Sequence, residues 1–114
     1  MLKDLFMAKF EYSRFLDLLL EFKYHEFEWD LGNQTKSFDK HNISVSEAEE
    51  IFYDDDLLAL GKQIEPKPTE PRYGVIGKNL NGKILFACFT IRNGKIRVIS
   101  ARIANKTERL TYES

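Results

Sequence analysis

The chain has very little of the chemistry that disulfides and metal centres need. Its 114 residues include one cysteine, Cys88, and two well-separated histidines. One thiol cannot form an internal disulfide, and the soft ligands are too few and too scattered for a zinc site. Cys88 stands in an apolar run, so we interpret it as a small buried side chain in a reducing compartment. We therefore expect neither a metal nor any other cofactor.

Long apolar runs are also missing. The first residues carry a charge every few positions, unlike a signal peptide, and no segment approaches the length of a membrane span. We expect a cytoplasmic protein. A chain of 114 residues can bury enough surface to fold as one domain without covalent staples.

Net charge is nearly absent overall, yet the two parts of the chain differ strongly. Residues 71–114 hold nine Lys and Arg against two Glu, a net of +7. Residues 1–70 hold eight basic against sixteen acidic side chains, a net of −8, and together they give the total of −1. The basic end can attract a polyanion, whereas the acidic end cannot.

The first 26 residues predict an amphipathic helix that extends the domain. Apolar side chains recur at spacings of three and four, which makes one stripe on a helix. The stripe consists of Leu5, Ala8, Tyr12, Phe15, Leu19 and Phe22. Such a stripe needs a surface to cover it, in its own domain, a second copy or a partner.

The next segment predicts a short strand and two helices. Residues 27–29 favour a strand, and Asp30 is a good N-cap for a helix that ends near His41. Ser44 and Glu47 form a capping box for a second helix, which stops at the run of aspartates at 54–56. Three adjacent carboxylates cannot all face one ion, so we interpret this run as a solvated turn.

The second half predicts an antiparallel β-meander of about four strands, so the fold class is α+β. Asn-Gly pairs at 81–82 and 93–94 separate alternating runs, and Asn-Gly is a strong signal for a type I′ hairpin turn. The predicted strands are residues 57–60, 73–80, 83–92 and 95–103.

Two-residue turns set the expected register of these strands. They place Tyr73, Thr90 and Arg97 in one row on one face. The other face would pack against the helices through Leu85, Ala87, Phe89, Ile91, Ile96, Val98 and Ser100. Arg102 falls on that packing face in a regular strand, and it can share a site with Arg97 only if a bulge intervenes.

The last helix begins at Asn105, an N-cap with Glu108 at the third helical position. Glu108 and Tyr112 lie four residues apart, on one side of this helix. Glu108 is thus a capping residue as well as a candidate for chemistry.

Several pieces of the chain, in order, resemble the BrnT toxins of bacterial type II toxin-antitoxin systems. The resemblance covers about residues 27–113 and is strongest in the run IRVISAR. It rests on Phe27-Glu28-Trp29-Asp30, Lys40-His41, Ser44-x-x-Glu47-Ala48, Arg72-Tyr73, Ile96 to Arg102, Glu108-Arg109 and Tyr112. The division of the chain would then be an extension, 1–26, and a toxin domain, 27–114.

The resemblance implies a compact RelE-like ribonuclease that cuts RNA without a metal and is neutralised by a ribbon-helix-helix, BrnA-like antitoxin. It also allows a dimer, or a heterotetramer with the antitoxin. Arginine donors match phosphate oxygens, so Arg97 and Arg102 would hold the phosphate. Proton transfer would fall to Glu108, His41 or Tyr112. Substrate binding would involve Arg72, Tyr73, Lys40 and Arg109.

A different class of function fits the same residues. The basic strand and helix could form a non-catalytic module that holds RNA or an acidic protein without cutting it. Each candidate also has an ordinary structural role: His41 beside a helix C-terminus, Tyr112 in packing, and Arg97 as a solvated strand residue.

Overall fold

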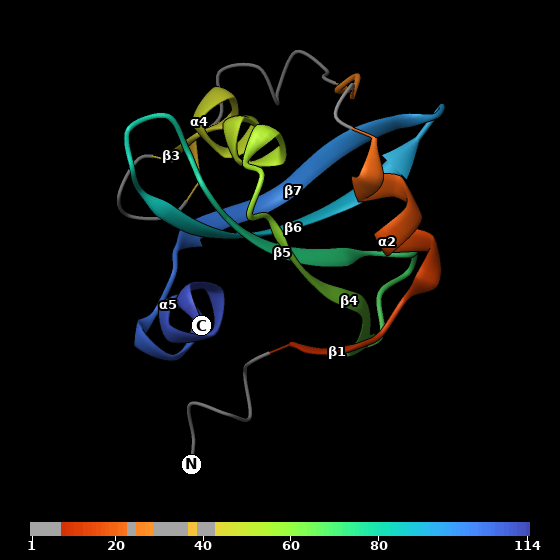
Figure 1. Cartoon of the computed structure of the whole chain (residues 1–114). Coiled ribbons are helices and arrows are strands. Elements are labelled where there is room, and N and C mark those ends of the chain that lie inside the picture. The colour runs from red at the N-terminus through yellow and green to blue at the C-terminus, as the bar shows by residue number, and fades with distance from the viewer. Residues whose placement is uncertain (1–7, 23–24, 29–36, 39–42) are drawn as a thin grey trace.

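The computed structural model describes residues 8–22, 25–28, 37–38 and 43–114, with residues 37–38 described by their backbone (Figure 1). These residues form an α+β fold with three helices and an antiparallel sheet of five strands, besides a small hairpin. The elements are β1 (Lys9–Glu11), α2 (Arg14–Glu21), β2 (Ser37–Phe38), β3 (Ile43–Ser44), α4 (Val45–Glu50), the 3₁₀ turn η1 (Ile51–Tyr53), β4 (Leu58–Glu65), β5 (Tyr73–Lys78), β6 (Ile84–Arg92), β7 (Lys95–Ile103) and α5 (Lys106–Glu113).

The main sheet has the strand order β1-β4-β5-β6-β7, with every neighbouring pair antiparallel. The predicted meander is therefore confirmed as β4 to β7, and β4 is longer than expected. Outside the meander, β1 adds a fifth strand to the free edge of β4. At the opposite edge, Phe27 makes an isolated parallel bridge to Ile96. The α4 and η1 segment lies on one side of the sheet and α5 on the other (Figure 1).

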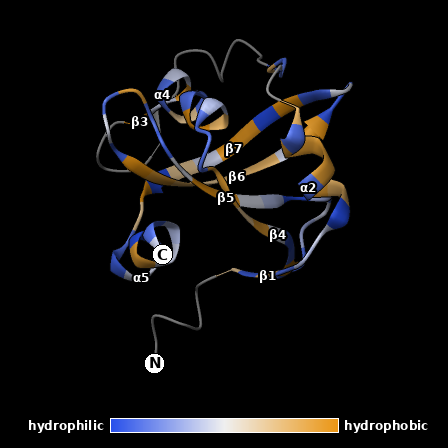
Figure 2. Ribbon diagram, in the orientation of Figure 1, coloured by the Kyte–Doolittle hydropathy of each residue, from blue (hydrophilic) through white to orange (hydrophobic). Residues whose placement is uncertain are grey.

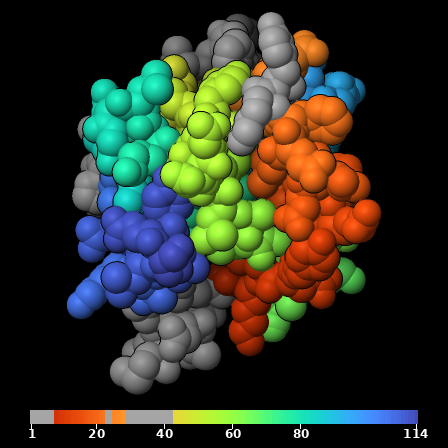
Figure 3. Space-filling model, in the orientation of Figure 1, coloured from red at the N-terminus to blue at the C-terminus, as the bar shows by residue number. Residues whose placement is uncertain are grey.

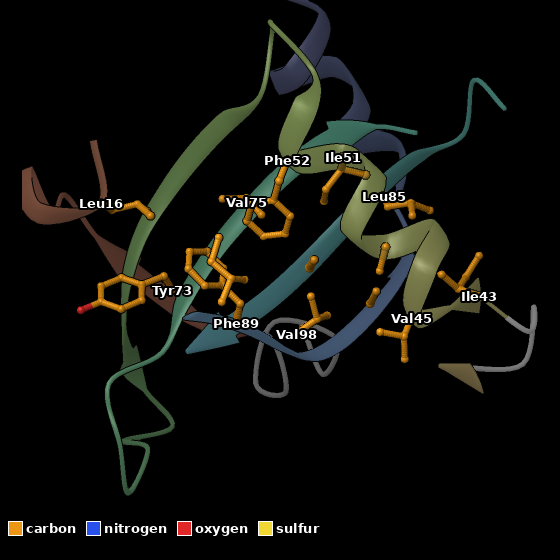
Figure 4. Close-up of a cluster of buried hydrophobic side chains, with 14 residues drawn as sticks. Leu16, Ile43, Val45, Ile51, Phe52, Tyr73, Val75, Leu85, Phe89 and Val98 are labelled. Atoms are coloured by element: carbon orange, nitrogen blue, oxygen red, sulfur yellow. The ribbon is translucent and has the colours of Figure 1, made fainter. Parts of the chain in front are cut away.

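The core lies between the sheet and the α4 and η1 segment. Phe52 of η1 meets Phe89 of β6 edge-to-face, with ring centroids 5.1 Å apart. Figure 4 shows Ile51 and Phe52 pointing down onto side chains from β5, β6 and β7. The predicted packing face is confirmed for Leu85, Ala87, Phe89, Ile91, Ile96 and Val98. The prediction of Ser100 on that face is wrong, because Ser100 is exposed.

The N-terminal helix is shorter than the sequence predicts, and its buried side is different. Lys9–Glu11 is a strand, and α2 begins only after Ser13, whose hydroxyl accepts the N–H of Leu16 at 3.1 Å. Leu16 is fully buried, whereas Tyr12 and Phe22 are 73% and 68% exposed. The unpaired edge of β4 explains the difference, because it offers hydrogen bonds to an extended segment.

The β1 and α2 segment lies along one side of the molecule, as Figure 3 shows in red and orange. The Phe10 ring covers Gly74 so closely that a Cβ there would lie 2.6 Å from it. Division of the chain at residue 26 stays a prediction. Because Leu16 is in the core, the segment before residue 26 contributes to the stability of the fold.

The two Asn-Gly turns differ. Asn93 and Gly94 both have positive φ, 53° and 74°, as the predicted type I′ turn requires. At the other turn only Gly82 does. There the Asn79 N–H donates to the Lys83 carbonyl, which makes a three-residue loop with a bulge. The type I′ prediction is wrong at Asn81-Gly82, and the register of β5 against β6 shifts by one residue.

The prediction of a helix from Asp30 to His41 falls mostly outside the described residues. Where it can be compared, it is wrong, because Ser37–Phe38 is a strand that pairs with Ile43–Ser44. The helix predicted after the Ser44 capping box is confirmed, with both reciprocal hydrogen bonds present.

Candidate functional site

The sheet face turned away from α4 carries arginines from several strand positions. In the observed register Tyr73 is opposite Phe89, and Thr90 is opposite Arg97. One residue further along the ladder, Arg72 takes the place beside Thr90, where the sequence predicted Tyr73. The row is therefore Arg72, Thr90 and Arg97. The predicted place of Tyr73 in it is wrong, because Tyr73 packs in the core on the other face.

A bulge in β7 brings Arg102 to this same face. Val98 is opposite Phe89 and Ser100 is opposite Cys88, so Ile99 is an extra residue without a partner. The extra residue reverses the alternation beyond it. Arg102, which a regular strand would turn toward the core, thus lies on the same face as Arg97. The bulge that the sequence required for these two arginines to share a site is present.

We call this surface the arginine face and define it by three rows. The rows are Arg72, Thr90 and Arg97; Gly74, Cys88 and Ser100; and Ile76, Phe86 and Arg102. In the middle row Gly74 is covered by the Phe10 ring and Cys88 is buried, while arginines stand at both ends. Ser100 is exposed, so solvent reaches the face between Arg97 and Arg102. A surface of this kind can hold an anion with several guanidinium donors.

Arg102 forms a bidentate ion pair with Glu108. Its Nη1 and Nη2 lie 2.7 and 2.8 Å from the two carboxylate oxygens. Glu108 also accepts the backbone N–H of Asn105 at 2.9 Å, which completes the predicted capping box of α5. The guanidinium stacks on Phe86, with Cζ 4.5 Å from the ring centroid. This pair ties the start of α5 to the sheet.

Arg97 has a looser pair, with Glu28. The distance from its Nη1 to the nearer oxygen is 3.5 Å, and the Arg97 side chain is 15% exposed. The Asn93 amide also donates to Glu28, at 3.0 Å. The Glu28 N–H bonds to the Ile96 carbonyl at 2.8 Å, so the backbone holds this carboxylate beside β7. Glu28 is a site residue that sequence reasoning missed, because the contact is long-range.

Glu70 and Arg92 were missed as well. They form a 2.8 Å contact at the outer end of the arginine face, beside the row of Arg72 and Arg97. Arg72 is half-buried, and its Nε finds no hydrogen-bond partner among the described residues. Strand alternation could have placed Arg92 on the face of Thr90. Nothing local indicated that the loop of residues 66–71 would bring a carboxylate there.

Tyr112 fastens α5 to Asp54, the residue that follows η1. Its hydroxyl donates to Asp54 at 2.5 Å, and the Lys78 N–H donates to the same oxygen at 2.8 Å. Burial and then the hydrogen bond to Asp54 raise the pKa of Tyr112 well above 10.0. Burial opposes ionisation of Asp54, but hydrogen bonds from Tyr112, Lys78 and Asp56 outweigh it and lower that pKa. Figure 2 shows α5 as mainly hydrophilic.

The remaining candidates stand apart from this face or outside the described chain. Arg109 is exposed on α5, and Lys40 and His41 lie outside the described residues. Cys88 is buried as predicted, and burial raises the pKa of its thiol. Across the described ranges, no group of three His, Cys, Asp or Glu side chains could hold a metal ion.

The fold and this face define a small α+β protein with an arginine-lined sheet surface suited to anions. The family model for BrnT, a ribonuclease toxin of type II toxin-antitoxin systems, matches residues 29–108. The chain belongs to this family of ribonuclease toxins, whose systems pair each toxin with an antitoxin. The sequence resemblance is thereby confirmed.

Comparison with characterised proteins finds no match for the chain. None of the helices in the described part of the chain has the length and apolar character that a membrane span requires.

Proposed function

We propose that this toxin is a metal-independent endoribonuclease that binds the scissile phosphate of RNA on the arginine face. The observation that carries the proposal is the row of Arg72, Thr90 and Arg97 in a member of a ribonuclease toxin family. Two guanidinium groups on one row present fixed donors to phosphate oxygens. Arg102 stands at the other end of the face. Lys40 and Arg109 stay proposed substrate-binding residues, whereas Tyr73, packed in the core on the other face, is left out of the set.

The proposed reaction needs no metal because the ribose supplies the nucleophile. A base takes the proton of the 2′-hydroxyl, the O2′–P bond forms, and the P–O5′ bond breaks as an acid protonates the departing O5′. The guanidinium groups stabilise the charge that develops on the phosphorus oxygens. The products are a 2′,3′-cyclic phosphate and a 5′-hydroxyl end.

Glu28 is the described carboxylate best supported as the base, since it lies beside Arg97 and on no helix cap. Glu108 is engaged by Arg102 and by the backbone of Asn105. The acid is one of His41, Glu108 and Tyr112. Burial and the hydrogen bond to Asp54 raise the pKa of Tyr112 and hold back its proton at neutral pH, so Tyr112 is the least favoured of the three.

The test is cleavage of a defined RNA with EDTA present, followed by identification of the new ends. We expect 5′-hydroxyl ends and undiminished cleavage in the chelator. Arg97→Ala should lower the rate roughly 10²- to 10³-fold, the usual loss when a transition-state donor is removed. Lys106→Ala, which removes an exposed charge on α5, is the matched control. RNA that stays intact at high protein concentration would favour a binding module instead.

The antitoxin is proposed to be a ribbon-helix-helix protein that covers the arginine face in the cytoplasm. Hiding the phosphate site is the simplest block to cleavage, and acidic or carbonyl groups would complement Arg72 and Arg97. Protection of these arginines from chemical modification in the complex is the expected result. Protection confined to α2 would instead require inhibition at a distance.

A further inference from the structure

The outer end of the arginine face already contains an anion. Glu70, at the end of the proline-rich loop after β4, accepts a hydrogen bond from Nη2 of Arg92 at 2.8 Å. The next residue of the loop is fixed over the same row, because the Thr90 hydroxyl donates to the Pro71 carbonyl at 2.6 Å. The strand ladder then places Arg72 and Arg97 on either side of Thr90. One carboxylate therefore sits within a group of three arginines.

The electrostatics agree with this placement. The hydrogen bond from Arg92 is the main cause that lowers the pKa of Glu70; desolvation opposes it, and the charges of Arg92, Arg72 and Arg97 add to the lowering. Glu108, by comparison, contacts Arg102 and the backbone of Asn105. Three cations act on Glu70, although only one donates to it.

A phosphodiester can make the contacts that Glu70 makes. Both are anions with two outward oxygens, and guanidinium groups bind both in the same planar way. The contact between Arg92 and Glu70 is open to water, with the side chains 40% and 33% exposed. An incoming phosphate can thus reach Arg92 and replace the carboxylate there, beside Arg72 and Arg97, without unpacking the core.

We propose that Arg72, Arg92 and Arg97 form a phosphate-binding site that Glu70 occupies in the free toxin and leaves when an RNA backbone phosphate binds. The inference rests on the proposed function for its choice of RNA as the ligand. Its consequence is that Glu70 competes with RNA, so the free toxin binds RNA less tightly than its arginines alone would allow.

The experiment measures binding of a fluorescent 2′-O-methyl RNA, which cannot be cut by attack of a 2′-hydroxyl. Wild type is compared with Glu70→Gln and with Glu65→Gln. Glu65 is a matched control, since it lies near the same loop but pairs with Lys9 at 3.7 Å. We expect Glu70→Gln to lower Kd about fivefold, and Glu65→Gln to change it much less, because only Glu70 competes at the arginines.

A second background shows whether the gain arises at this site. In Arg92→Gln the carboxylate has lost its donor, so adding Glu70→Gln should give less than half of its effect on log Kd in wild type. An equal gain in both backgrounds would mean a general effect of net charge and would overturn the proposal. So would a Glu70→Gln affinity no better than that of Glu65→Gln. An unchanged urea midpoint for each variant guards against misfolding.

Failure of this inference and failure of the proposed function give different results. Because the probe cannot be cleaved, the binding result does not depend on nuclease activity. Tighter binding by Glu70→Gln together with intact natural RNA would leave the phosphate site standing and remove the catalytic proposal. Cleavage of natural RNA without tighter binding would remove only the role of Glu70.

Discussion

Two arginine–carboxylate pairs stand at opposite ends of the arginine face, and they differ in construction. Arg102 and Glu108 share two short contacts, Glu108 also caps α5, and its side chain is only 10% exposed. Arg92 and Glu70 share one contact, between a strand end and a loop, and water reaches both. The first pair holds α5 against the sheet. The second pair lies at the surface, where we propose that a phosphate binds.

The comparison shows that the same chemical pairing serves two purposes, according to what else the carboxylate does. Removing Glu108 leaves a helix N-terminus and a partly buried guanidinium without their acceptor. Removing Glu70 leaves Arg92, whose side chain is 40% exposed, to be solvated by water. Arg92 is therefore more available to an incoming anion than Arg102, although both arginines are paired.

The largest effect should come from breaking the Glu108 pair. Glu108→Ala should lower the free energy of unfolding by about 2–4 kcal/mol, because it removes both a cap and a partly buried ion pair. Urea unfolding monitored by circular dichroism measures it. Glu113→Ala, in the same helix but exposed, should stay within about 0.5 kcal/mol of wild type. Equal free energies of unfolding for the two variants would show that Glu108 contributes no more to stability than the exposed Glu113.

A smaller effect should follow from loosening the second attachment of α5. Tyr112→Phe removes a hydrogen bond to a carboxylate and should cost about 1–2 kcal/mol at pH 7. The folded pKa of Asp54 is lowered from 3.8, so ionised Asp54 stabilises the fold above that value. This stability is lost as the pH falls through the folded pKa.

The difference in the free energy of unfolding between Tyr112→Phe and wild type should therefore narrow below about pH 4. Protonation of Asp54 removes the carboxylate charge that the Tyr112 hydroxyl stabilises. Urea unfolding at a series of pH values from 7 to 3 measures it. A gap that stays constant over this range would mean that Tyr112 acts through packing and not through Asp54.

The smallest effect on stability should come from changing Glu70, the carboxylate of the solvent-exposed pair. Glu70→Gln and Glu108→Gln make the same chemical change, so comparing their urea midpoints isolates the surroundings of each carboxylate. We expect no measurable shift for Glu70→Gln and a clear loss for Glu108→Gln. If the two shifts are alike, the contrast between the ends of the face is wrong.

The two Asn-Gly turns show how far a local signal reaches. At Asn93-Gly94 the dipeptide predicted turn type and register correctly, and Thr90 pairs with Arg97 as expected. At Asn81-Gly82 the same dipeptide misled, because the side chain of Asn79 accepts the N–H groups of Asn81 and Lys83 and widens the loop. A competing side chain two residues upstream changed the row from Tyr73 to Arg72.

The sequence by itself determined the features that depend on neighbours along the chain. Both predicted capping boxes form, the Asn93 turn closes as expected, and alternation identified most of the packing face. The ordered family motifs also pointed to the ribonuclease toxins, which the family match confirms. These features follow from hydrogen bonds within a few residues and from a two-residue period, so they can be read without knowing the fold.

Only the tertiary structure decided which charged groups meet. The Ile99 bulge that turns Arg102 toward Arg97, the placing of Glu28 beside Arg97, and the arrival of Glu70 at Arg92 all depend on segments distant in the chain. The edge of β4 likewise made a strand of residues that read as helix. Packing and unpaired backbone groups select such contacts from many that local preference leaves equal, because each local preference is worth less than burial of a side chain such as Leu16.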